Sequence, residues 1–361
     1  MPLSARKFLK SVGGSFAPML AILLIPMVAA LGFSIDYTSA VSTKALMQNA
    51  LDAASLSITK LATTTSLADR QVSLQDSYLA NGGQGTAKLD SFVVAADGTA
   101  SIKASAGFAM PTSFMQIAKI NTVQIGVASA VTKRPALVQA TFKVDKISGY
   151  WGKTMTLYGT KFGDTVANKL MKITYAYNNF GDPKGYGTST VYTVNGTTST
   201  MVQQQVCTTA IVISFYGLPT TTIVQTDSYG RKYATTCVTT TFPATGAGAV
   251  IDVSLMDQLY LQMDVPSAAS ANPPQPTVLK SNDPATSNRL YMGTSPTDMV
   301  EVATGQVVDI FTAVPCGQTS LQAWEDGGNP VPAAVSNADF SYFVTGKCAF
   351  NQRASETLLT Q

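Results

Sequence analysis

The sequence contains no histidine in its 361 residues. This absence excludes the Ser-His-Asp and Cys-His arrangements of nucleophilic catalysis, zinc sites that depend on imidazole, and the commonest general base near neutral pH. The G-x-S-x-G nucleophile motif is also missing. We therefore expect a protein that is not an enzyme, with no catalytic residue, cofactor or metal site; a hydrolase with a carboxylate pair or a Ser-Lys dyad is the least favoured alternative.

Charged residues are scarce as well. They make up 12% of the chain, which is about half of the usual share. The net charge of +3 comes from scattered lysines, with no basic stripe interleaved with aromatic residues. A nucleic-acid partner is therefore not expected. The 45% share of hydrophobic residues provides core material for two or three domains.

One long uncharged apolar run lies near the N-terminus, at residues 16–33, and reads FAPMLAILLIPMVAALGF. A helix of about 18 to 20 residues covers the hydrocarbon core of a bilayer. Basic residues favour the cytoplasmic side, and three precede the run: Arg6, Lys7 and Lys10. We therefore expect a single-pass protein of the bacterial inner membrane, with a cytoplasmic basic tail at 1–14, a transmembrane helix at 15–35 and the bulk of the chain in the periplasm.

A cleaved signal peptide is the alternative for this segment, with Val28 and Ala30 at the small-residue positions of a cleavage site. The run is long for that role, and a helical pattern continues after it. No proline or glycine occurs between Ser34 and Asn81, which predicts a long helix that stops at Gly82-Gly83. Apolar residues at 3-4-3 spacing mark one face of this helix: Leu51, Ala54, Ile58 and Leu61. We favour a retained anchor over a segment that is cleaved after Ala30.

Four cysteines occur, far apart and without a C-x-x-C motif, which argues against a metal knuckle or a redox motif. Outside the cytoplasm an even number of cysteines indicates disulfides. Of the three possible pairings we favour Cys207 with Cys237 and Cys316 with Cys348, because each closes a local loop. Closing loops of roughly 30 residues stabilises a fold by ~3–4 kcal/mol on the chain-entropy model. Four buried free thiols are the alternative.

Short motifs flank the apolar run. Gly13-Gly14-Ser15-Phe16-Ala17 opens it, Gly32-Phe33-Ser34-Ile35-Asp36-Tyr37 closes it, and Lys44-Ala45-Leu46-Met47-Gln48-Asn49-Ala50-Leu51-Asp52-Ala53-Ala54 follows. In this order and spacing they resemble the N-terminal module of TadG-like proteins of the tight-adherence (Flp-type) pilus machinery. The resemblance is close over about the first 60 residues. It implies pilin-like or other pilus-assembly partners, which would pack against a face of the amphipathic helix.

Two departures from the family pattern refine this resemblance. Met19 stands where Flp-type prepilins carry a glutamate five residues after the cleaved glycine, which argues against cleavage by a prepilin peptidase. The D-x-S-x-S metal motif of a von Willebrand type A domain is approached only at residues 252–256, where Met256 cannot ligate a hard cation. We therefore expect a TadG-like protein without that domain.

Residues 36–134 are expected to form a pilin-like α+β module. After the long helix, the turn signal Asp97-Gly98 predicts a hairpin. Pro111 is expected to open a short helix. The predicted elements after the long helix are strands at 89–96 and 100–106, a helix at 111–120 and a strand at 123–131.

The pattern is almost wholly β from 135 to 266, which predicts a sandwich-like domain. Its first two strands, 138–144 and 153–158, are expected to form a hairpin with an aromatic turn at Tyr150-Trp151. No charged residue occurs between Lys184 and Asp227, and this Thr-rich stretch fits either an adhesive face or a solvated sandwich face. Further strands are expected at 173–177, 190–194, 210–216 and 251–263.

A Pro- and Ala-rich stretch, SAASANPPQP, predicts a linker or long loop within 267–298. A small β module is expected at 299–361. The acidic segment 325–330 lacks the spacing of a calcium loop, so we interpret it as a plain turn. The strands expected in this module are 299–302, 307–311, 320–324 and 340–344.

The predicted fold class is therefore α+β: an anchor helix that continues into a pilin-like head, followed by one or two mainly-β periplasmic modules. These patterns favour a membrane-anchored, non-enzymatic component of a Flp/Tad-type pilus assembly or adhesion apparatus, acting as a periplasmic scaffold or a minor pilin-like subunit. An anchored adhesin or ligand-binding protein with no assembly role is the alternative. Whether the chain forms oligomers is left open.

Overall fold

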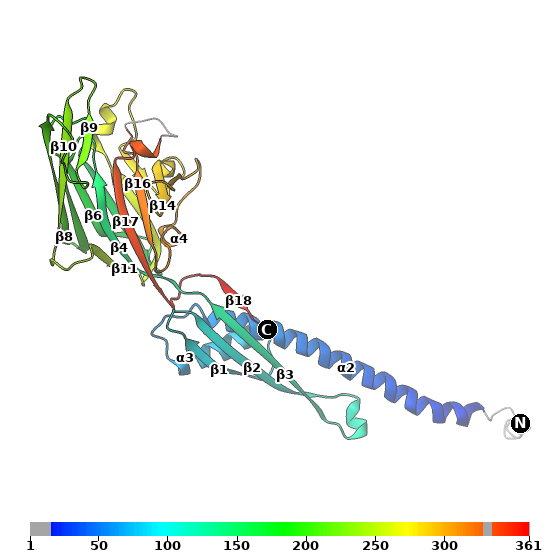
Figure 1. Cartoon of the computed structure of the whole chain (residues 1–361). Helices are drawn as coiled ribbons and strands as arrows, with labels where there is room; N and C mark the ends of the chain where they lie inside the picture. Colours follow the sequence, from blue (N-terminus) through cyan, green and yellow to red (C-terminus); the bar gives the residue numbers. More distant parts are fainter. Residues whose placement is uncertain (1–15, 328–333, 361) are drawn as a thin grey trace, which may run out of the picture. The chain divides into compact units, whose positions relative to one another are not determined.

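The computed structural model describes residues 16–327 and 334–360 and contains two compact units (Figure 1). Unit 1 comprises Met1–Arg134 and Ala354–Gln361, and unit 2 comprises Pro135–Arg353. The predicted basic tail at 1–14 lies outside the described residues, as does the end of the predicted turn at 325–330. Unit 1 is thus built from both ends of the chain.

Helix α2, Phe16–Ile58, is the longest element of unit 1. Its C-terminal half supplies the core of the unit through Met47, Leu51, Ala54 and Ile58, all of which are fully buried. The predicted 3-4-3 face is confirmed at its first three positions. It is, however, occupied by the protein's own core, so the expectation that this face packs against pilin-like partners is wrong.

The predicted uninterrupted helix is wrong as well, because α2 ends at Ile58 and a second helix, α3, spans Leu67–Ala80. Ser66 caps α3: its hydroxyl oxygen accepts the N–H of Asp69, and the hydroxyl donates to the Asp69 carboxylate. A reciprocal cap of this kind favours a new helix start over helix continuation. Three β-branched threonines at 63–65, which lower helix propensity, precede the cap. The break was therefore readable from the sequence.

Two buried cations close the C-terminal end of α2. The Arg70 guanidinium donates to the carbonyl oxygens of Ile58 and Ala62 at 2.8 and 2.7 Å. The Lys133 ammonium donates to the carbonyl oxygen of Thr59 at 2.8 Å. The last carbonyls of a helix lack intrahelical partners and carry partial negative charge, so cations stabilise this end.

The sheet of unit 1 is antiparallel with the strand order β1-β2-β3-β18. Helices α2 and α3 cover its buried face. The predicted hairpin turn is confirmed, with Gly98 at a φ of 86°. The fourth strand comes from the C-terminal end of the chain, so unit 2 is inserted between β3 and β18. The strands are β1 (Thr86–Val94), β2 (Ala100–Pro111), β3 (Thr122–Lys133) and β18 (Thr357–Leu359).

The connection between β2 and β3 differs from the predicted helix at 111–120. Strand β2 continues to Pro111, which pairs with Thr122 of β3. The intervening residues hold only a 3-10 turn, η2, at Met115–Ala118. Because so few residues join two paired strand ends, the segment closes as a hairpin tip rather than as an α-helix.

Unit 2 is a β-sandwich in which an eight-stranded and a six-stranded sheet share one hydrophobic core. The larger sheet has the order β13-β12-β5-β6-β7-β8-β10-β9, and the smaller has the order β11-β4-β17-β16-β14-β15. The strands of the larger sheet are β5 (Lys153–Lys161), β6 (Ala167–Tyr177), β7 (Gly187–Asn195), β8 (Thr198–Val212), β9 (Ile223–Thr226), β10 (Lys232–Thr241), β12 (Met256–Asp264) and β13 (Val278–Lys280). Those of the smaller sheet are β4 (Ala136–Ile147), β11 (Ala249–Asp252), β14 (Leu290–Gly293), β15 (Val300–Glu301), β16 (Thr319–Trp324) and β17 (Phe340–Ala349).

Strands β4 and β5 do not form the predicted hairpin. Strand β4 pairs with β11 and β17 in the smaller sheet, whereas β5 pairs with β12 and β6 in the larger one. The aromatic segment at 148–152 is therefore a crossing between two sheets. Alternating patterns mark both strands but carry no information about their partners.

The predicted division of the β region at 267–298 also differs from the structure. Strand β17, from the expected C-terminal module, pairs along its length with β4, from the expected central domain. The Pro-rich stretch is a loop between the paired strands β12 and β13, where the Val265 N–H donates to the Thr277 carbonyl and Ala268 is buried. The chain from 135 to 353 is one folding unit because long-range strand pairing joins the two predicted modules.

Two further predicted strands are corrected. The segment at 307–311 leads into a short helix, α4, at Ile310–Ala313, because the Asp309 carboxylate caps it by accepting the Phe311 N–H. The expected strand at 251–263 is interrupted after Asp252 by a turn that separates β11 from β12.

Both disulfides lie in unit 2. Cys207 on β8 bonds to Cys237, which stands directly opposite it on β10. Cys316 bonds to Cys348 on β17. The expectation of disulfides, rather than free thiols, is confirmed.

Candidate functional site: the anchor helix and its buried carboxylate

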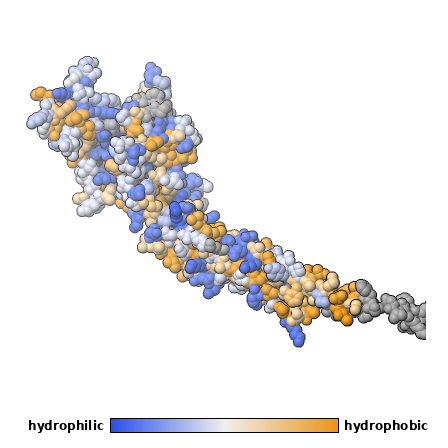
Figure 2. Space-filling model, turned by 45° about the vertical axis from the view of Figure 1, so that its right-hand side comes forward, coloured by the Kyte–Doolittle hydropathy of each residue, from blue (hydrophilic) through white to orange (hydrophobic). Residues whose placement is uncertain are grey.

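The N-terminal half of α2 exposes its apolar side chains. Among the helices of the described residues, α2 alone has the length and composition of a membrane-crossing segment. Figure 2 shows hydrophobic surface over this end of the helix. A large exposed apolar surface on a helix indicates a nonaqueous partner. The exposed apolar side chains up to the end of the run are Met19, Leu20, Ile22, Leu23, Leu24, Met27, Val28, Leu31 and Phe33.

Asp36 lies where this apolar half ends, and the residue is 4% exposed. The carboxylate accepts three consecutive backbone N–H groups from the β2–β3 hairpin tip: Ser113 at 3.0 Å, Phe114 at 2.9 Å and Met115 at 2.7 Å. Hydrogen bonds to a charged acceptor are stronger than neutral ones. The carboxylate thus holds the hairpin tip to the helix.

Gly32 lies one helical turn before Asp36 and makes the close approach possible. A Cβ atom at this position would lie 2.6 Å from Cβ of Phe114, closer than side chains pack. Glycine is unfavourable inside a helix by roughly 1 kcal/mol relative to alanine. Its presence is explained by the hairpin tip, which needs the space. Gly32 and Asp36 therefore form one contact surface, which we call the Gly32/Asp36 latch.

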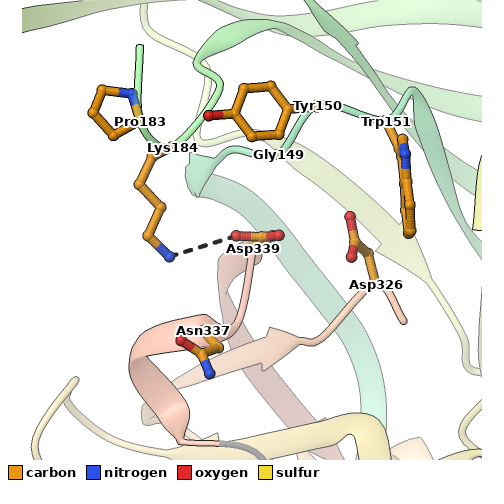
Figure 3. A pocket seen from close by; sticks show the side chains of 8 residues that line it. All are labelled: Gly149, Tyr150, Trp151, Pro183, Lys184, Asp326, Asn337 and Asp339. Atoms are coloured by element: carbon orange, nitrogen blue, oxygen red, sulfur yellow. Dashed lines mark ion pairs between the residues drawn. The ribbon is translucent and has the colours of Figure 1, made fainter. Parts of the chain in front are cut away.

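A pocket of about 300 Å³ opens in unit 2 where three interstrand connections meet (Figure 3). Tyr150 and Trp151 come from the β4–β5 crossing, Lys184 from the β6–β7 connection, and Asp326 and Asp339 from the β16–β17 connection. In the close-up, Asp339 lies between Lys184 and Asp326. The pocket combines an aromatic wall with paired charges.

Opposite charges balance each other in this pocket. Asp326 forms an ion pair with Lys153, and both side chains are buried. Lys184 lies 3.8 Å from Asp339. Burial raises the pKa of Asp339, the ammonium groups of Lys153 and Lys184 oppose this effect, and the carboxylate of Asp326 adds to it. A buried, neutralised charge cluster suits a polar, uncharged ligand or a purely structural role.

In the described residues, neither the Ser-Lys sequence pattern nor a cluster of metal-ligating side chains forms a catalytic site. The Ser-Lys pattern S-x-x-K does occur in the sequence, at 57–60 and, outside the described residues, at 4–7. The Ser57 hydroxyl donates to the Ala54 carbonyl at 2.7 Å, while Lys60 is exposed. Within 16–327 and 334–360, no three Asp, Glu or Cys side chains converge as a metal site would require.

The structure brings together residues that lie far apart in the sequence, at Asp36 and at the Lys153–Asp326 ion pair. In the sequence Asp36 stands out only as part of a motif, and its partners lie 77 to 79 residues away in the chain. The i, i+4 spacing of Gly32 and Asp36 was the available signal, because it places both residues on one helical face. The Lys153–Asp326 pair, 173 residues apart, had no such signal.

Comparison with known proteins gives one finding. Residues 14–57 match the family described as putative Flp pilus-assembly TadE/G-like. No curated protein and no solved structure shows a significant match to the chain. The matched segment covers almost all of α2, including the exposed apolar half, the Gly32/Asp36 latch and most of the core-forming half. The chain thus carries an N-terminal TadE/G-like domain, which links it to Flp pilus assembly.

Proposed function

We propose that this chain is a membrane-anchored, non-enzymatic component of a Flp/Tad-type pilus assembly apparatus, acting as a periplasmic scaffold or minor pilin-like subunit. The observation that carries the proposal is the coincidence of the TadE/G-like match with α2. The same helix exposes apolar side chains at one end and forms the core of unit 1 at the other. A continuous helix fixes the distance between a bilayer and unit 1.

The anchor is proposed to cross the inner membrane once, with the N-terminus in the cytoplasm and with unit 2 and the part of unit 1 that follows the anchor in the periplasm. The basic residues that precede the apolar run support this orientation. The two disulfides support an oxidising compartment for unit 2.

Pilin-like or other pilus-assembly proteins are the proposed partners. Because the C-terminal half of α2 buries its apolar face within unit 1, we propose that helix–helix contacts use the N-terminal half, which exposes its large apolar side chains. Such contacts inside a bilayer depend on packing and on small residues. Ala29 and Ala30 offer small side chains on this exposed half.

The test is deletion of the gene in its own host, with pilin synthesis and surface pili measured separately. We expect pilin to be made normally and surface pili to be lost or altered. The full chain should restore piliation, whereas residues 36–361 exported behind a cleavable signal peptide should not. Normal surface pili in the deletion strain would refute the proposal.

Binding of an uncharged polar ligand, such as a glycan, is a second candidate function, favoured by the aromatic pocket at Tyr150 and Trp151. Aromatic faces bind the apolar faces of sugars, and balanced charges leave the pocket neutral. A Trp151→Ala variant of the full chain should then bind a glycan surface more weakly while piliation stays normal. Equal binding by both proteins would exclude this function for the pocket.

A further inference from the structure

We propose that the β2–β3 hairpin tip, residues 113–120, is a second membrane-contacting element that lies in the headgroup–acyl boundary of the bilayer beside α2. This inference rests on the proposed anchoring of α2. It assigns a lipid contact to a segment that is 77 or more residues distant from Asp36 in the chain.

The tip is held at one level of the anchor helix. The Gly32/Asp36 latch binds it through three hydrogen bonds and a close contact between Gly32 and Phe114. Helix α2 and the hairpin tip both belong to unit 1. The position of the tip along α2 is therefore determined by named contacts.

That level coincides with the outer boundary of the hydrocarbon core. At the helical rise, the 16 steps from Phe16 to Gly32 span about 24 Å and the 20 steps to Asp36 about 30 Å, and the apolar core of a bilayer is about 30 Å thick. If the apolar run fills the core, Gly32 and Asp36 lie close to the headgroups. The tip, bound at this level, meets the same boundary.

The tip exposes apolar side chains there. Ile117 is 77% exposed, Ile120 42% and Phe114 38%. Lys119, between the two isoleucines, is also exposed, and a lysine can keep its ammonium among the headgroups while its stem lies in the apolar layer. On α2, the exposed Tyr37 lies next to the latch, and tyrosines favour this interface. The composition is that of an interfacial element.

The backbone of the tip is also suited to a medium with little water. Unpaired backbone groups are costly there. Asp36 accepts the N–H groups of Ser113, Phe114 and Met115. Carbonyl oxygens within the tip accept the backbone N–H groups of Ile117, Lys119 and Ile120. The latch therefore positions the hairpin tip. It also provides an acceptor for three backbone N–H groups that would have few water partners at this boundary.

A depth measurement on the full chain tests the proposal. The four native cysteines form the two disulfides, so an introduced cysteine is the only free thiol. Ile117→Cys is labelled with an environment-sensitive fluorophore in vesicles of phosphatidylethanolamine and phosphatidylglycerol. Lipids brominated at shallow or deep acyl positions serve as quenchers. The matched control is Val93→Cys, an exposed valine at the opposite end of the same sheet; the anchor reference is Leu23→Cys.

We expect blue-shifted emission at position 117 with strong quenching by shallow bromines, deep quenching at position 23, and water-like emission at position 93. Quenching at 23 together with water-like emission at 117 would overturn the hairpin contact and leave the anchor standing. Blue-shifted emission at 117 without lipid quenching would also overturn it, in favour of a protein partner such as a second copy. Absence of quenching at 23 would refute the anchor itself.

Discussion

Among single residues, Asp36 joins two segments that lie far apart in the chain, because its carboxylate accepts three backbone N–H groups of the β2–β3 hairpin tip. A neutral side chain of similar size could accept from one oxygen only, whereas the carboxylate accepts three N–H groups through two oxygens. This explains why a charged residue stands directly after an apolar run. Its role is to hold a hairpin tip, and its charge is compensated by the backbone dipoles around it.

Replacing Asp36 tests this role. Asp36→Ala leaves these three part-buried N–H groups without their acceptor, which should weaken the attachment of the hairpin tip to α2. We expect amide hydrogen exchange of Ser113, Phe114 and Met115 to accelerate by about 100-fold, and less in Asp36→Asn, which keeps one acceptor oxygen. The control is Thr38→Ala, an exposed position on the same helix. Unchanged exchange in Asp36→Ala would contradict the latch.

Lys133 predicts an unusual pH dependence. Burial lowers its pKa from 10.5 to about 8, and the positive charges of Lys60 and Arg70 add to the effect. Between pH 8 and 10.5 the unfolded chain therefore binds more protons than the folded chain, so the free energy of unfolding should rise with pH, by up to about 3 kcal/mol.

The measurement is chemical unfolding followed by helical circular dichroism, because α2 and α3 both belong to unit 1. The rise in the free energy of unfolding with pH should disappear in Lys133→Met, because methionine does not titrate. It should persist in Lys103→Met, which removes an exposed lysine of the same sheet. A rise of equal size in Lys133→Met would assign it to other groups.

At the scale of elements, α2 combines two surfaces on one helix. Its N-terminal half carries the uncharged apolar run and exposes large apolar side chains, and its C-terminal half buries one face against the sheet. The Gly32/Asp36 latch stands at the junction of the two halves. The β2–β3 hairpin thus contacts and supports the helix at the point where its apolar half ends.

A matched pair of glycine substitutions tests this bracing. Gly32→Ala places a methyl group 2.6 Å from the Cβ of Phe114, so the tip must move away from the helix although alanine favours helix formation. Gly126→Ala adds the same group on β3, where nothing lies within 4 Å. We expect amide hydrogen exchange of Ser113, Phe114 and Met115 to accelerate in Gly32→Ala and to stay unchanged in Gly126→Ala.

At the scale of the whole molecule, the two units are stabilised by different means. Unit 1 has no cysteine and depends on its helix–sheet core and on capped helix ends, whereas unit 2 holds both disulfides and both tryptophans. The chain enters unit 2 after β3 and returns through β18 to the sheet of unit 1. Each unit can therefore be followed by its own signal.

Loss of the disulfides should act on unit 2 alone. On the chain-entropy model each closed loop contributes about 3 kcal/mol. The double variant Cys207→Ala/Cys237→Ala should lower the urea midpoint seen by tryptophan fluorescence and leave the helical circular dichroism transition in place. Cys316→Ala/Cys348→Ala provides the matched comparison. A parallel shift of the helical transition would show that the two units unfold together.

Features that depend on neighbouring residues can be predicted from the sequence alone. The apolar run, the 3-4-3 face at Leu51, Ala54 and Ile58, the Asp97-Gly98 turn and the alternating strands all follow from local periodicity and turn chemistry. The TadE/G-like match rests on the same kind of local pattern. The helix break before Ser66 was present in the sequence too, as a cap preceded by β-branched residues.

Contacts between distant segments, in contrast, depend on the folding of the whole chain. Alternation marks β4 and β5 as strands, yet their partners, β17 and β12, lie far along the chain, and no local pattern encodes that pairing. The same holds for the return of β18 to unit 1 and for the three donors that surround Asp36. Strand partners and buried acceptors are selected by the total burial and hydrogen bonding of the folded chain, which no short stretch of sequence contains.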